Sequence, residues 1–413
     1  MKTDVPQNPP ASATTEAAAR VREHCTQCGM CVKECAFLAR HGTPRHLAEI
    51  FDPADGRCRK LPFECSLCGL CSAVCPQNLP LDRMFLEMRR AAVSRGCRVY
   101  GDDCAFLGYE RRGVSRHLSF YAVPADCDTV FFPGCTLPAT RPNQTHRLLR
   151  HLQRFTPRLG IVLDCCTKPS HDLGRQAYFE AMFGEMRAFL LSCGVRRVIV
   201  ACPNCHKIFS SYGKGLSVTT VYEELAGGGL PPARRLRPGR VTVHDPCVFR
   251  FEAGVQGLVR DMLGRLGCGV EEMPHHGRTT FCCGEGASVS CVAPELARSW
   301  TRLRAAEAGG RRVVTYCTGC TELLSGSVDA VHLLDLVFGR EASPPAERLR
   351  SLFPLTCFNR LRLKDRLRRE FAGARTRERT FSADAGERKC GLTRNRLGLL
   401  VSLAISKLFA LRR

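Results

Sequence analysis

The sequence lacks the motifs with which proteins bind nucleotide cofactors. Neither a G-x-G-x-x-G run nor a P-loop occurs in its 413 residues, so the chain shows no flavin, nicotinamide or nucleotide site of its own. Residues 1–20 lack the apolar segment of a secretory signal, and the apolar stretch 397–406 is too short to span a bilayer. These absences predict a cytoplasmic protein whose chemistry does not depend on a bound nucleotide.

Cysteine, by contrast, is abundant. The chain contains 27 cysteines, an odd number, and many of them stand in C-x-x-C pairs. Such spacing does not indicate a disulfide framework. In a reducing compartment, clustered thiols usually bind metals or carry out redox chemistry. Hydrophobic residues make up 44% of the chain, as in ordinary soluble proteins, and we therefore expect a folded metalloprotein.

Positive charge is in excess and unevenly distributed. The formal net charge is +22, and the residues from Arg340 onward include 19 Lys and Arg but only 7 Asp and Glu. Charge alone would permit nucleic-acid binding, but the cysteine pattern argues against it, and we expect no nucleic-acid partner. The apolar Leu397–Leu411 and its basic neighbours instead favour a helix on the inner membrane face, with packing on the protein or on a partner as the alternative.

Two cysteine clusters near the N-terminus have the spacing of bacterial ferredoxins. Each is C-x2-C-x2-C-x3-C, and proline follows the second. In this pattern three thiolates bind three corners of a 4Fe–4S cubane, and the fourth cysteine reaches across to the other cubane. Zinc, the alternative, usually pairs two C-x2-C knuckles instead. The spacing thus predicts two cubanes, one bound by Cys25, Cys28, Cys31 and Cys75 and the other by Cys65, Cys68, Cys71 and Cys35.

Residues 127–338 contain two similar halves. Each half has three short apolar runs that alternate with helical patterns such as 175–191 and 293–308, which is typical of parallel strands in α/β units. Each run leads directly to cysteine, and the corresponding cysteines lie 112, 117 and 115 residues apart, which indicates duplication. Ligands of such sheets gather beyond the carboxyl ends of the strands. The runs are 129–134, 159–164, 198–201, 241–246, 279–281 and 313–316.

Ten cysteines follow these runs, five in each half. They are Cys135, Cys165, Cys166, Cys202 and Cys205, then Cys247, Cys282, Cys283, Cys317 and Cys320. Five thiolates exceed the four that a cubane or a zinc ion needs, and adjacent cysteines can bridge neighbouring irons. His244 and Asp245 adjoin Cys247 and are candidates to support that site, with helix capping as the alternative for Asp245. We expect His332 to be a packed core residue.

The residues around these cysteines resemble a known family. Phe132-Pro133-Gly134-Cys135, Cys202-Pro203-Asn204-Cys205, His244-Asp245-Pro246-Cys247 and Cys282-Cys283-Gly284 are similar to the duplicated CCG domain of heterodisulfide reductase catalytic subunits. That domain also occurs in the iron–sulfur subunits of anaerobic glycerol-3-phosphate dehydrogenase and of glycolate and lactate oxidation systems, such as glycolate oxidase.

The resemblance implies a non-cubane 4Fe–4S cluster at each CCG motif, where the pair of clusters cleaves a disulfide. The ten cysteines above would then be catalytic cluster ligands. The first motif departs from the family because Thr167 follows Cys166 where glycine is usual, so its site could hold a non-cubane cluster, a cubane or zinc. We expect two cubanes and one or two further clusters.

The expected protein is an oxidoreductase that carries electrons from a partner, such as a flavoprotein, through the cubanes to the CCG sites, which reduce a disulfide or related acceptor. The alternative is the electron-transfer subunit of a membrane-associated dehydrogenase that delivers electrons to quinone. The expected fold is mixed, with a helical ferredoxin-like domain, two tandem α/β CCG domains related by pseudo-twofold duplication, and a basic helical tail. The expected parts are a leader at 1–20, the ferredoxin-like domain at 21–100, a connector at 101–126, the CCG domains at 127–230 and 240–338, and the tail at 340–413.

Overall fold

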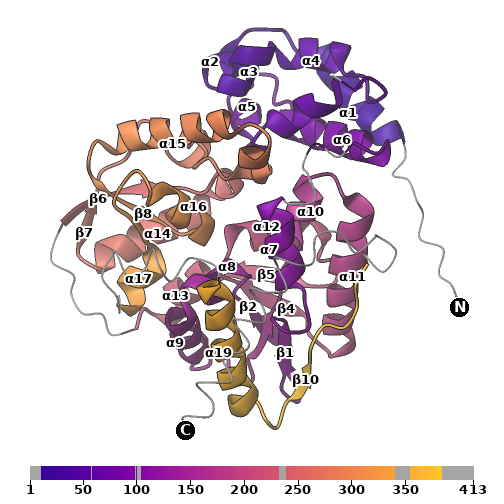
Figure 1. The fold of residues 1–413 in the computed structure, drawn as a ribbon. Helices are drawn as coiled ribbons and strands as arrows, with labels where there is room; N and C mark the ends of the chain where they lie inside the picture. The colour runs from indigo at the N-terminus through magenta and orange to yellow at the C-terminus, as the bar shows by residue number, and fades with distance from the viewer. Residues whose placement is uncertain are drawn as a thin grey trace, which may run out of the picture.

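A helical N-terminal domain lies above two α/β domains (Figure 1). The computed structural model describes residues 11–56, 58–97, 99, 104–231, 239–339 and 354–383. The helical domain lies at one end of the molecule. Beneath it the two α/β domains lie beside each other, and the second of them carries α15. The N-terminal domain can therefore contact both of the others.

The N-terminal domain is built from short helices around a small apolar core. The sequence places residues 11–20 in a loose leader, but they form the first part of α1, because Ala18 and Val21 are buried in this core. Helix α1 packs on α4 and α6. The elements are α1 (Ala11–His24), α2 (Met30–Lys33), α3 (Ala36–His41), α4 (Pro44–Ile50), the 3₁₀ helix η1 (Cys58–Glu64), α5 (Leu70–Ala73) and α6 (Leu81–Ser94).

The first α/β domain contains a six-stranded sheet of described residues in the order β10-β1-β3-β2-β4-β5. The strands β3, β2, β4 and β5 are parallel, while β1 pairs antiparallel with both β3 and β10. The strands are β1 (Phe120–Val123), β2 (Thr129–Phe132), β3 (Gly160–Leu163), β4 (Arg197–Val200), β5 (Ser217–Thr220) and β10 (Arg375–Arg377). The helices are α8 (Thr136–Thr140), α9 (Pro142–Leu152), α10 (Lys168–Asp172), α11 (Gln176–Ser192), α12 (Pro203–Tyr212) and α13 (Val221–Gly228).

The second α/β domain contains a parallel sheet in the order β7-β6-β8-β9, which repeats the order β3-β2-β4-β5 of the first. The repeated order agrees with duplication, whereas a pseudo-twofold relation stays a prediction. The strands are β6 (Gly239–His244), β7 (Cys268–Val270), β8 (Arg312–Thr315) and β9 (Ala330–His332). The helices are η2 (Cys247–Phe249), α14 (Ala253–Arg265), η3 (Gly277–Thr279), η4 (Gly286–Cys291), α15 (Pro294–Ala308), α16 (Thr318–Leu324) and α17 (Leu333–Phe338).

One strand predicted for the repeat does not form. The run 279–281 is not a strand, because the chain has already left the sheet after β7 and the run begins within the 3₁₀ helix η3. Cys282 and Cys283 are therefore presented by an irregular segment rather than directly by a strand end. The patterns 175–191 and 293–308, in contrast, form α11 and α15 as predicted.

Segments before and after the two repeated halves complete the first α/β domain. The connector 101–126 carries α7 (Ala105–Gly113) and β1, and α19 (Leu355–Glu370) packs on α8 and α9. The sequence places α19 in a basic amphipathic tail, but Leu363 and Leu367 join the core of the domain. Arg360 and Lys364 are buried with them and donate hydrogen bonds to backbone carbonyls of residues 113–118. The apolar segment Leu397–Leu411 lies outside the described residues.

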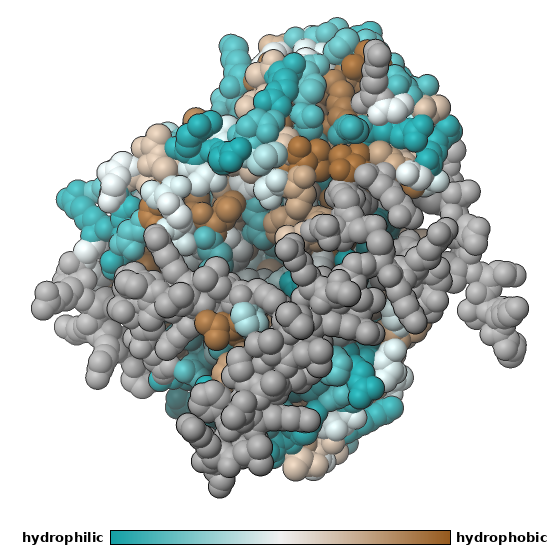
Figure 2. All heavy atoms as spheres, in the orientation of Figure 1, coloured by the Kyte–Doolittle hydropathy of each residue, from teal (hydrophilic) through white to brown (hydrophobic). Residues whose placement is uncertain are grey.

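In Figure 2 hydrophobic side chains form patches among hydrophilic ones on the described surface that is visible. Within the described ranges, no helix combines the length and the hydropathy needed to cross a bilayer.

Candidate iron–sulfur centres

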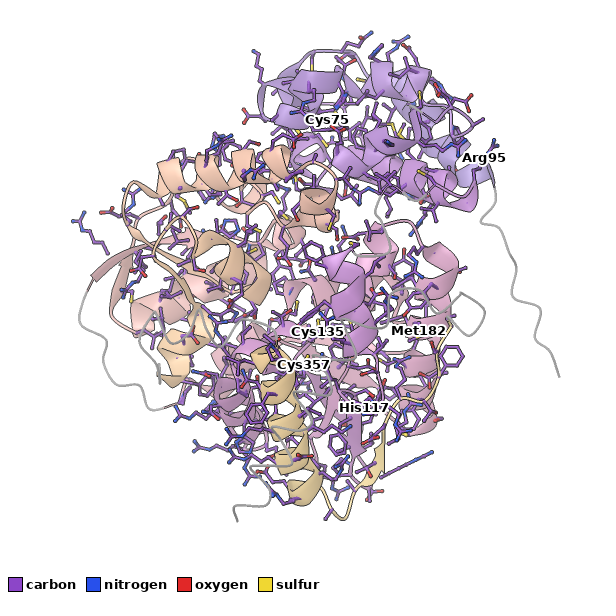
Figure 3. The ribbon with its side chains drawn as sticks, viewed as in Figure 1. Cys75, Arg95, His117, Cys135, Met182 and Cys357 are labelled. Carbon is purple, nitrogen blue, oxygen red and sulfur yellow. The ribbon has the colours of Figure 1, made fainter. Side chains whose placement is uncertain are left out.

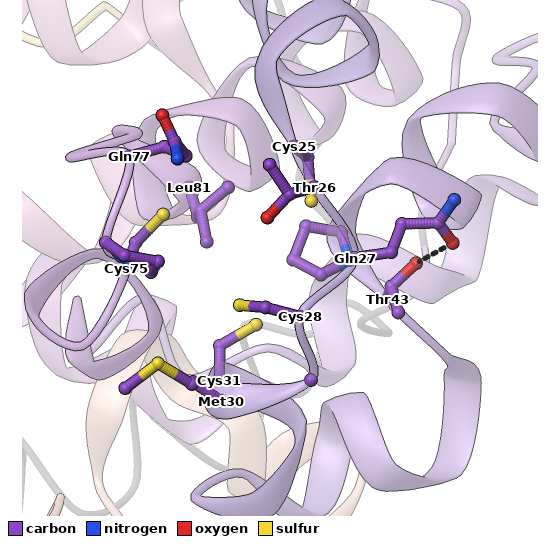
Figure 4. A pocket seen from close by; sticks show the side chains of 13 residues that line it. Cys25, Thr26, Gln27, Cys28, Met30, Cys31, Thr43, Cys75, Gln77 and Leu81 are labelled. Carbon is purple, nitrogen blue, oxygen red and sulfur yellow. Dashed lines mark hydrogen bonds between the residues drawn. The ribbon is translucent and has the colours of Figure 1, made fainter.

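Four cysteines of the N-terminal domain surround one pocket, here called the outer pocket. It is lined by Cys25, Cys28, Cys31 and Cys75. In Figure 4 the sulfurs of Cys28, Cys31 and Cys75 point into the shared space, and Cys25 lies across from Cys75. The structure thus brings the fourth cysteine of the second motif to the three of the first, as the crossed ferredoxin pattern predicts.

The remaining four cysteines of this domain line a second pocket, here called the inner pocket. They are Cys35, Cys65, Cys68 and Cys71. The inner pocket is also lined by Trp300 of α15, so it lies at the junction with the second α/β domain. Cys28 of the outer pocket, in contrast, is exposed.

Left-handed turns shape both cysteine loops. Gly29 and Gly69 have φ of 77° and 71° and directly precede α2 and α5. Two residues earlier, Gln27 and Leu67 also adopt positive φ. Such turns direct backbone N–H groups toward the sulfurs, and the amide of Leu67 donates to the sulfur of Cys65 at 3.4 Å. The same turn in both motifs explains why their spacing is the same.

The environment of these thiols disfavours free, unpaired thiolates. Burial, followed by the charges of Cys25 and Cys28, raises the pKa of Cys31 to about 12. Burial likewise raises the pKa of Cys35 to about 12. Thiols packed in this way stay protonated unless a cation joins them, so the two sets fit a positively charged metal centre with thiolate ligands.

Changing Cys75 to serine should damage the centre held by Cys25, Cys28 and Cys31, although residue 75 belongs to the other sequence motif. In the full-length protein prepared anaerobically, we expect a loss of about four irons per chain and of one of two interacting spins in the EPR spectrum after reduction. Cys58→Ser, in the same domain but in neither pocket, is the control. Stoichiometric zinc with negligible iron in the unmodified protein would contradict the assignment.

The ten cysteines of the α/β domains surround one central cavity. Nine of them line it, from both domains. Cys282, the tenth, is fully buried and is not part of the lining. Figure 3 shows Cys135 near the centre of the molecule, with Cys75 in the domain above. The lining cysteines are Cys135, Cys165, Cys166, Cys202, Cys205, Cys247, Cys283, Cys317 and Cys320.

The departure from the usual CCG sequence in the first half does not remove the turn. Thr167 adopts the left-handed conformation itself, with φ of 55°, and its hydroxyl donates to the carbonyl of Cys166. At the corresponding Gly284, φ is 107° and a Cβ would lie 2.6 Å from the carbonyl oxygen of Ala297. Glycine is therefore required in the second half only.

The second cysteine of each adjacent pair has a lowered pKa. Hydrogen bonds from Cys165 and Cys205 lower the pKa of Cys166 to about 6, and the sulfurs of Cys166 and Cys205 lie 3.5 Å apart. Hydrogen bonds from Cys282 and Cys320 lower the pKa of Cys283 to about 7. Both halves thus arrange a thiolate at the same position, which suits a metal ligand.

His244 belongs to the second half and has no histidine counterpart in the first. It is fully buried, and its ring lies within 4.8 Å of the sulfurs of Cys283 and Cys320. Phe132 occupies the corresponding place in the first half. Asp245, in contrast, accepts hydrogen bonds from Arg260, Tyr316 and the Gly277 amide, so it positions the loop. His332 is a packed core residue that caps α17, as expected.

Charged residues that the sequence reasoning missed also line the cavity. Lys168 is paired with Asp172, and Glu285 faces Gly319. Lys168 and Glu285 each follow the second cysteine of a pair by two residues, and this common position in the repeat could have identified them. Burial raises the pKa of Glu285, while the Lys168 ammonium lowers it. The cavity thus holds one cation near one carboxyl group that has lost much of its hydration.

The inner pocket adjoins the cysteines of the second half. Leu70, Phe281, Cys282 and Trp300 form one buried cluster, against which Cys68 and Cys247 pack. Arg250 reinforces the junction by donating to the carbonyl of Cys68 at 3.1 Å and to that of Thr280 at 2.7 Å. The order in space is therefore outer pocket, inner pocket, second CCG site and central cavity.

A buried arginine joins all three domains. Arg89 of α6 is 0% exposed and donates to carbonyls of its own domain, at Pro62, Phe63 and Cys65. It also donates to the carbonyl of Asp172 at 2.8 Å in the first α/β domain and to that of Ala287 at 3.0 Å in the second. One side chain thus fixes the N-terminal domain on the rim of the cavity.

Comparisons with known proteins agree with this organisation. Residues 24–80 match the 4Fe-4S dicluster domain, and residues 129–210 and 241–325 each match the CCG cysteine-rich domain. The chain is 25% identical over 354 residues to a subunit of fumarate reductase (CoM/CoB) of Methanothermobacter marburgensis, covering 76% of this chain and 69% of the relative. It is 24% identical over 330 residues to a subunit of the dihydromethanophenazine:CoB–CoM heterodisulfide reductase of Methanosarcina mazei, covering 67% and 80%.

Among solved structures, aspartate racemase of Picrophilus torridus is 13% identical with a TM-score of 0.25, covering 55% of this chain and all of that one, a likeness too low to bear on fold or function. The fold and the grouped cysteines define an iron–sulfur electron-transfer protein. More specifically, the chain joins a 4Fe-4S dicluster domain to two CCG cysteine-rich domains and is related to heterodisulfide reductase.

Proposed function

We propose that this chain is a heterodisulfide reductase-like oxidoreductase that reduces a disulfide, or a related acceptor, in the central cavity. The observation that carries the proposal is that cysteines of both CCG sites line one cavity. An acceptor with two sulfurs to reduce could then meet one site with each sulfur. Two similar α/β domains that present their cysteines to a common space are the arrangement that pseudo-twofold duplication would produce.

In this proposal the outer and inner pockets each hold a 4Fe–4S cubane, and the ten CCG cysteines hold one or two further clusters, non-cubane at least in the second half. Clusters of this kind supply one-electron storage, while the protein supplies position and environment. The second half is favoured for the non-cubane type because it keeps the Cys-Cys-Gly sequence and because the buried His244 lies near Cys283 and Cys320 there.

The charged side chains of the cavity would orient the acceptor. Lys168 offers an ammonium group beside the first site, held in place by Asp172. It would bind a polar or anionic end of the acceptor, while Glu285 would face the end nearer the second site. The remaining wall, which includes Phe106 and Leu67, would exclude water from the reacting sulfurs.

Electrons would come from a redox partner protein that docks near the exposed Cys28 of the outer pocket. The relatives reported above are named as reductase subunits, which favours the disulfide interpretation over delivery of electrons to quinone. A position on the inner membrane face stays a prediction for residues 397–411, and flotation of the full-length protein with anionic liposomes at low salt tests it.

The test offers acceptors to the anaerobically purified, cluster-containing protein in the presence of reduced methyl viologen. We expect the CoB–CoM heterodisulfide or a simpler disulfide, such as cystine, to reoxidise two viologens and yield two thiols for each disulfide consumed. A water-soluble quinone should react no faster than it does without protein. Rapid reaction with the quinone and none with any disulfide would overturn the proposal.

A further inference from the structure

Two cysteines outside all four cluster sites lie in contact. The sulfurs of Cys104 and Cys291 are 3.3 Å apart, although the residues are 187 positions apart in the chain. Cys104 is buried at the start of α7, and Cys291 is exposed at the end of η4. Neither residue lines the outer pocket, the inner pocket or the central cavity.

The surroundings of this pair favour sulfur–sulfur chemistry over metal binding. In the part of the chain that the structure describes, three metal-binding side chains lie within 4.8 Å of one another at one place, which is His244, Cys283 and Cys320. Cys104 and Cys291 therefore have no third described donor at that distance. The apolar neighbours of Cys104 include Phe63 and Leu107. Two thiols with no further donor among the described residues at that distance are suited to a disulfide, whose bond length of about 2.05 Å needs a small movement of the sulfurs.

One member of the pair is poised to react. The hydrogen bond with Cys291, assisted by backbone N–H groups of Phe106 and Leu107, lowers the pKa of Cys104 to about 6. A thiolate is therefore available at neutral pH, and because Cys291 is exposed, a molecule in solution can reach the pair.

The pair joins two separate walls of the central cavity. Helix α7, which begins after Cys104, contributes Phe106 and Tyr109 to the lining. The η4 segment, which ends at Cys291, contributes Gly286, Ala287 and Ser288. A covalent bond between the two cysteines would fix the separation of these walls.

We propose that Cys104 and Cys291 form a reversible disulfide across the cavity walls by exchange with a low-molecular-weight disulfide. Cys291 passes its proton to the Cys104 thiolate across their hydrogen bond and attacks one sulfur of that molecule, which forms a mixed disulfide and releases one thiolate. That thiolate takes up the proton, so Cys104 is again ionised. The Cys104 thiolate then attacks the Cys291 sulfur and releases the second thiolate. The pair loses two electrons and its one proton, and the external disulfide gains the two electrons, that proton and a second proton from water to become two thiols. This inference does not depend on the proposed acceptor chemistry.

The experiment uses the full-length, cluster-containing protein under anaerobic conditions. It is equilibrated with mixtures of reduced and oxidised glutathione, quenched with acid, alkylated and digested, and the cysteine peptides are identified by mass spectrometry. We expect a cross-linked peptide of Cys104 and Cys291 that increases with the oxidised fraction, disappears with dithiothreitol, and forms without loss of iron.

Two variants make the outcome specific. Cys291→Ser should abolish the cross-link and leave iron content unchanged, whereas Cys97→Ser, a change at another thiol of the same apolar cluster, should leave the cross-link intact. If Cys104 and Cys291 are recovered as alkylated thiols at every glutathione ratio, or if either pairs equally well with other cysteines, the proposal fails.

Discussion

Changing Cys283 to serine should remove the second CCG centre and reduce acceptor turnover to background. Cys283 is 3% exposed, lines the cavity, and stands between Cys282, Cys320 and His244. A serine hydroxyl does not ionise near neutral pH, so the variant would lose the thiolate on which the site depends. We expect a loss of about four irons per chain. Iron analysis, EPR and the viologen assay measure these effects.

The signals of the outer and inner pockets should persist in this variant. Cys282→Ser should behave similarly, because Cys282 is buried beside Cys68 and Cys247 at the junction with the inner pocket. Cys268→Ser is the matched control, since Cys268 is buried on β7 of the same domain but does not line the cavity. If the Cys282 and Cys283 variants both retain full iron and full activity, the CCG site does not work as proposed.

Replacing Arg89 by leucine should have the largest effect on stability. The change would remove a donor from five buried carbonyls, of which that of Pro62 keeps a further donor, the Cys65 amide. An unpaired buried carbonyl costs about 1–3 kcal/mol, and even partial relaxation would leave a loss of at least about 3 kcal/mol. Since the carbonyls belong to all three domains, we expect the N-terminal domain to separate from the rim of the cavity. The midpoint of urea unfolding, followed by cluster absorbance, should fall.

Arg83→Leu provides the comparison for this change, because Arg83 lies on the exposed face of the same helix α6. That variant should unfold at the urea concentration of the unmodified protein. Reduced clusters of the N-terminal domain should also pass electrons to the cavity more slowly in Arg89→Leu than in Arg83→Leu. Equal unfolding midpoints and equal rates in the two variants would show that Arg89 does not hold the domains together.

The sequence predicts those features that depend on local spacing. The crossed grouping of Cys75 with Cys25, and of Cys35 with Cys65, follows from the length of the ferredoxin motifs and agrees with the two pockets. The gathering of the CCG cysteines follows from parallel strands, whose carboxyl ends share one edge. Both inferences need only the cysteine spacing within each motif and the direction of neighbouring strands.

Features that depend on long-range packing could not be predicted in this way. The charges of α19 suggest an exposed surface, yet Arg360 and Lys364 are buried because carbonyls of residues 113–118 accept their hydrogen bonds. The contact of Cys104 with Cys291 likewise joins elements far apart in the chain, so in the sequence both look like ordinary thiols outside any motif. No pattern of hydrophobicity carries such information.

The loop between Cys65 and Cys68 belongs to two sites at once. Its Ser66 and Leu67 line the central cavity, while the cysteines on either side line the inner pocket. For protein engineering, this overlap means that acceptor preference and electron supply cannot be redesigned separately at these positions. A larger side chain at residue 67, chosen to reshape the cavity, would also disturb a left-handed turn whose amide bonds the sulfur of Cys65. Selection for a new acceptor at this wall would therefore change the driving force of the reaction together with its specificity.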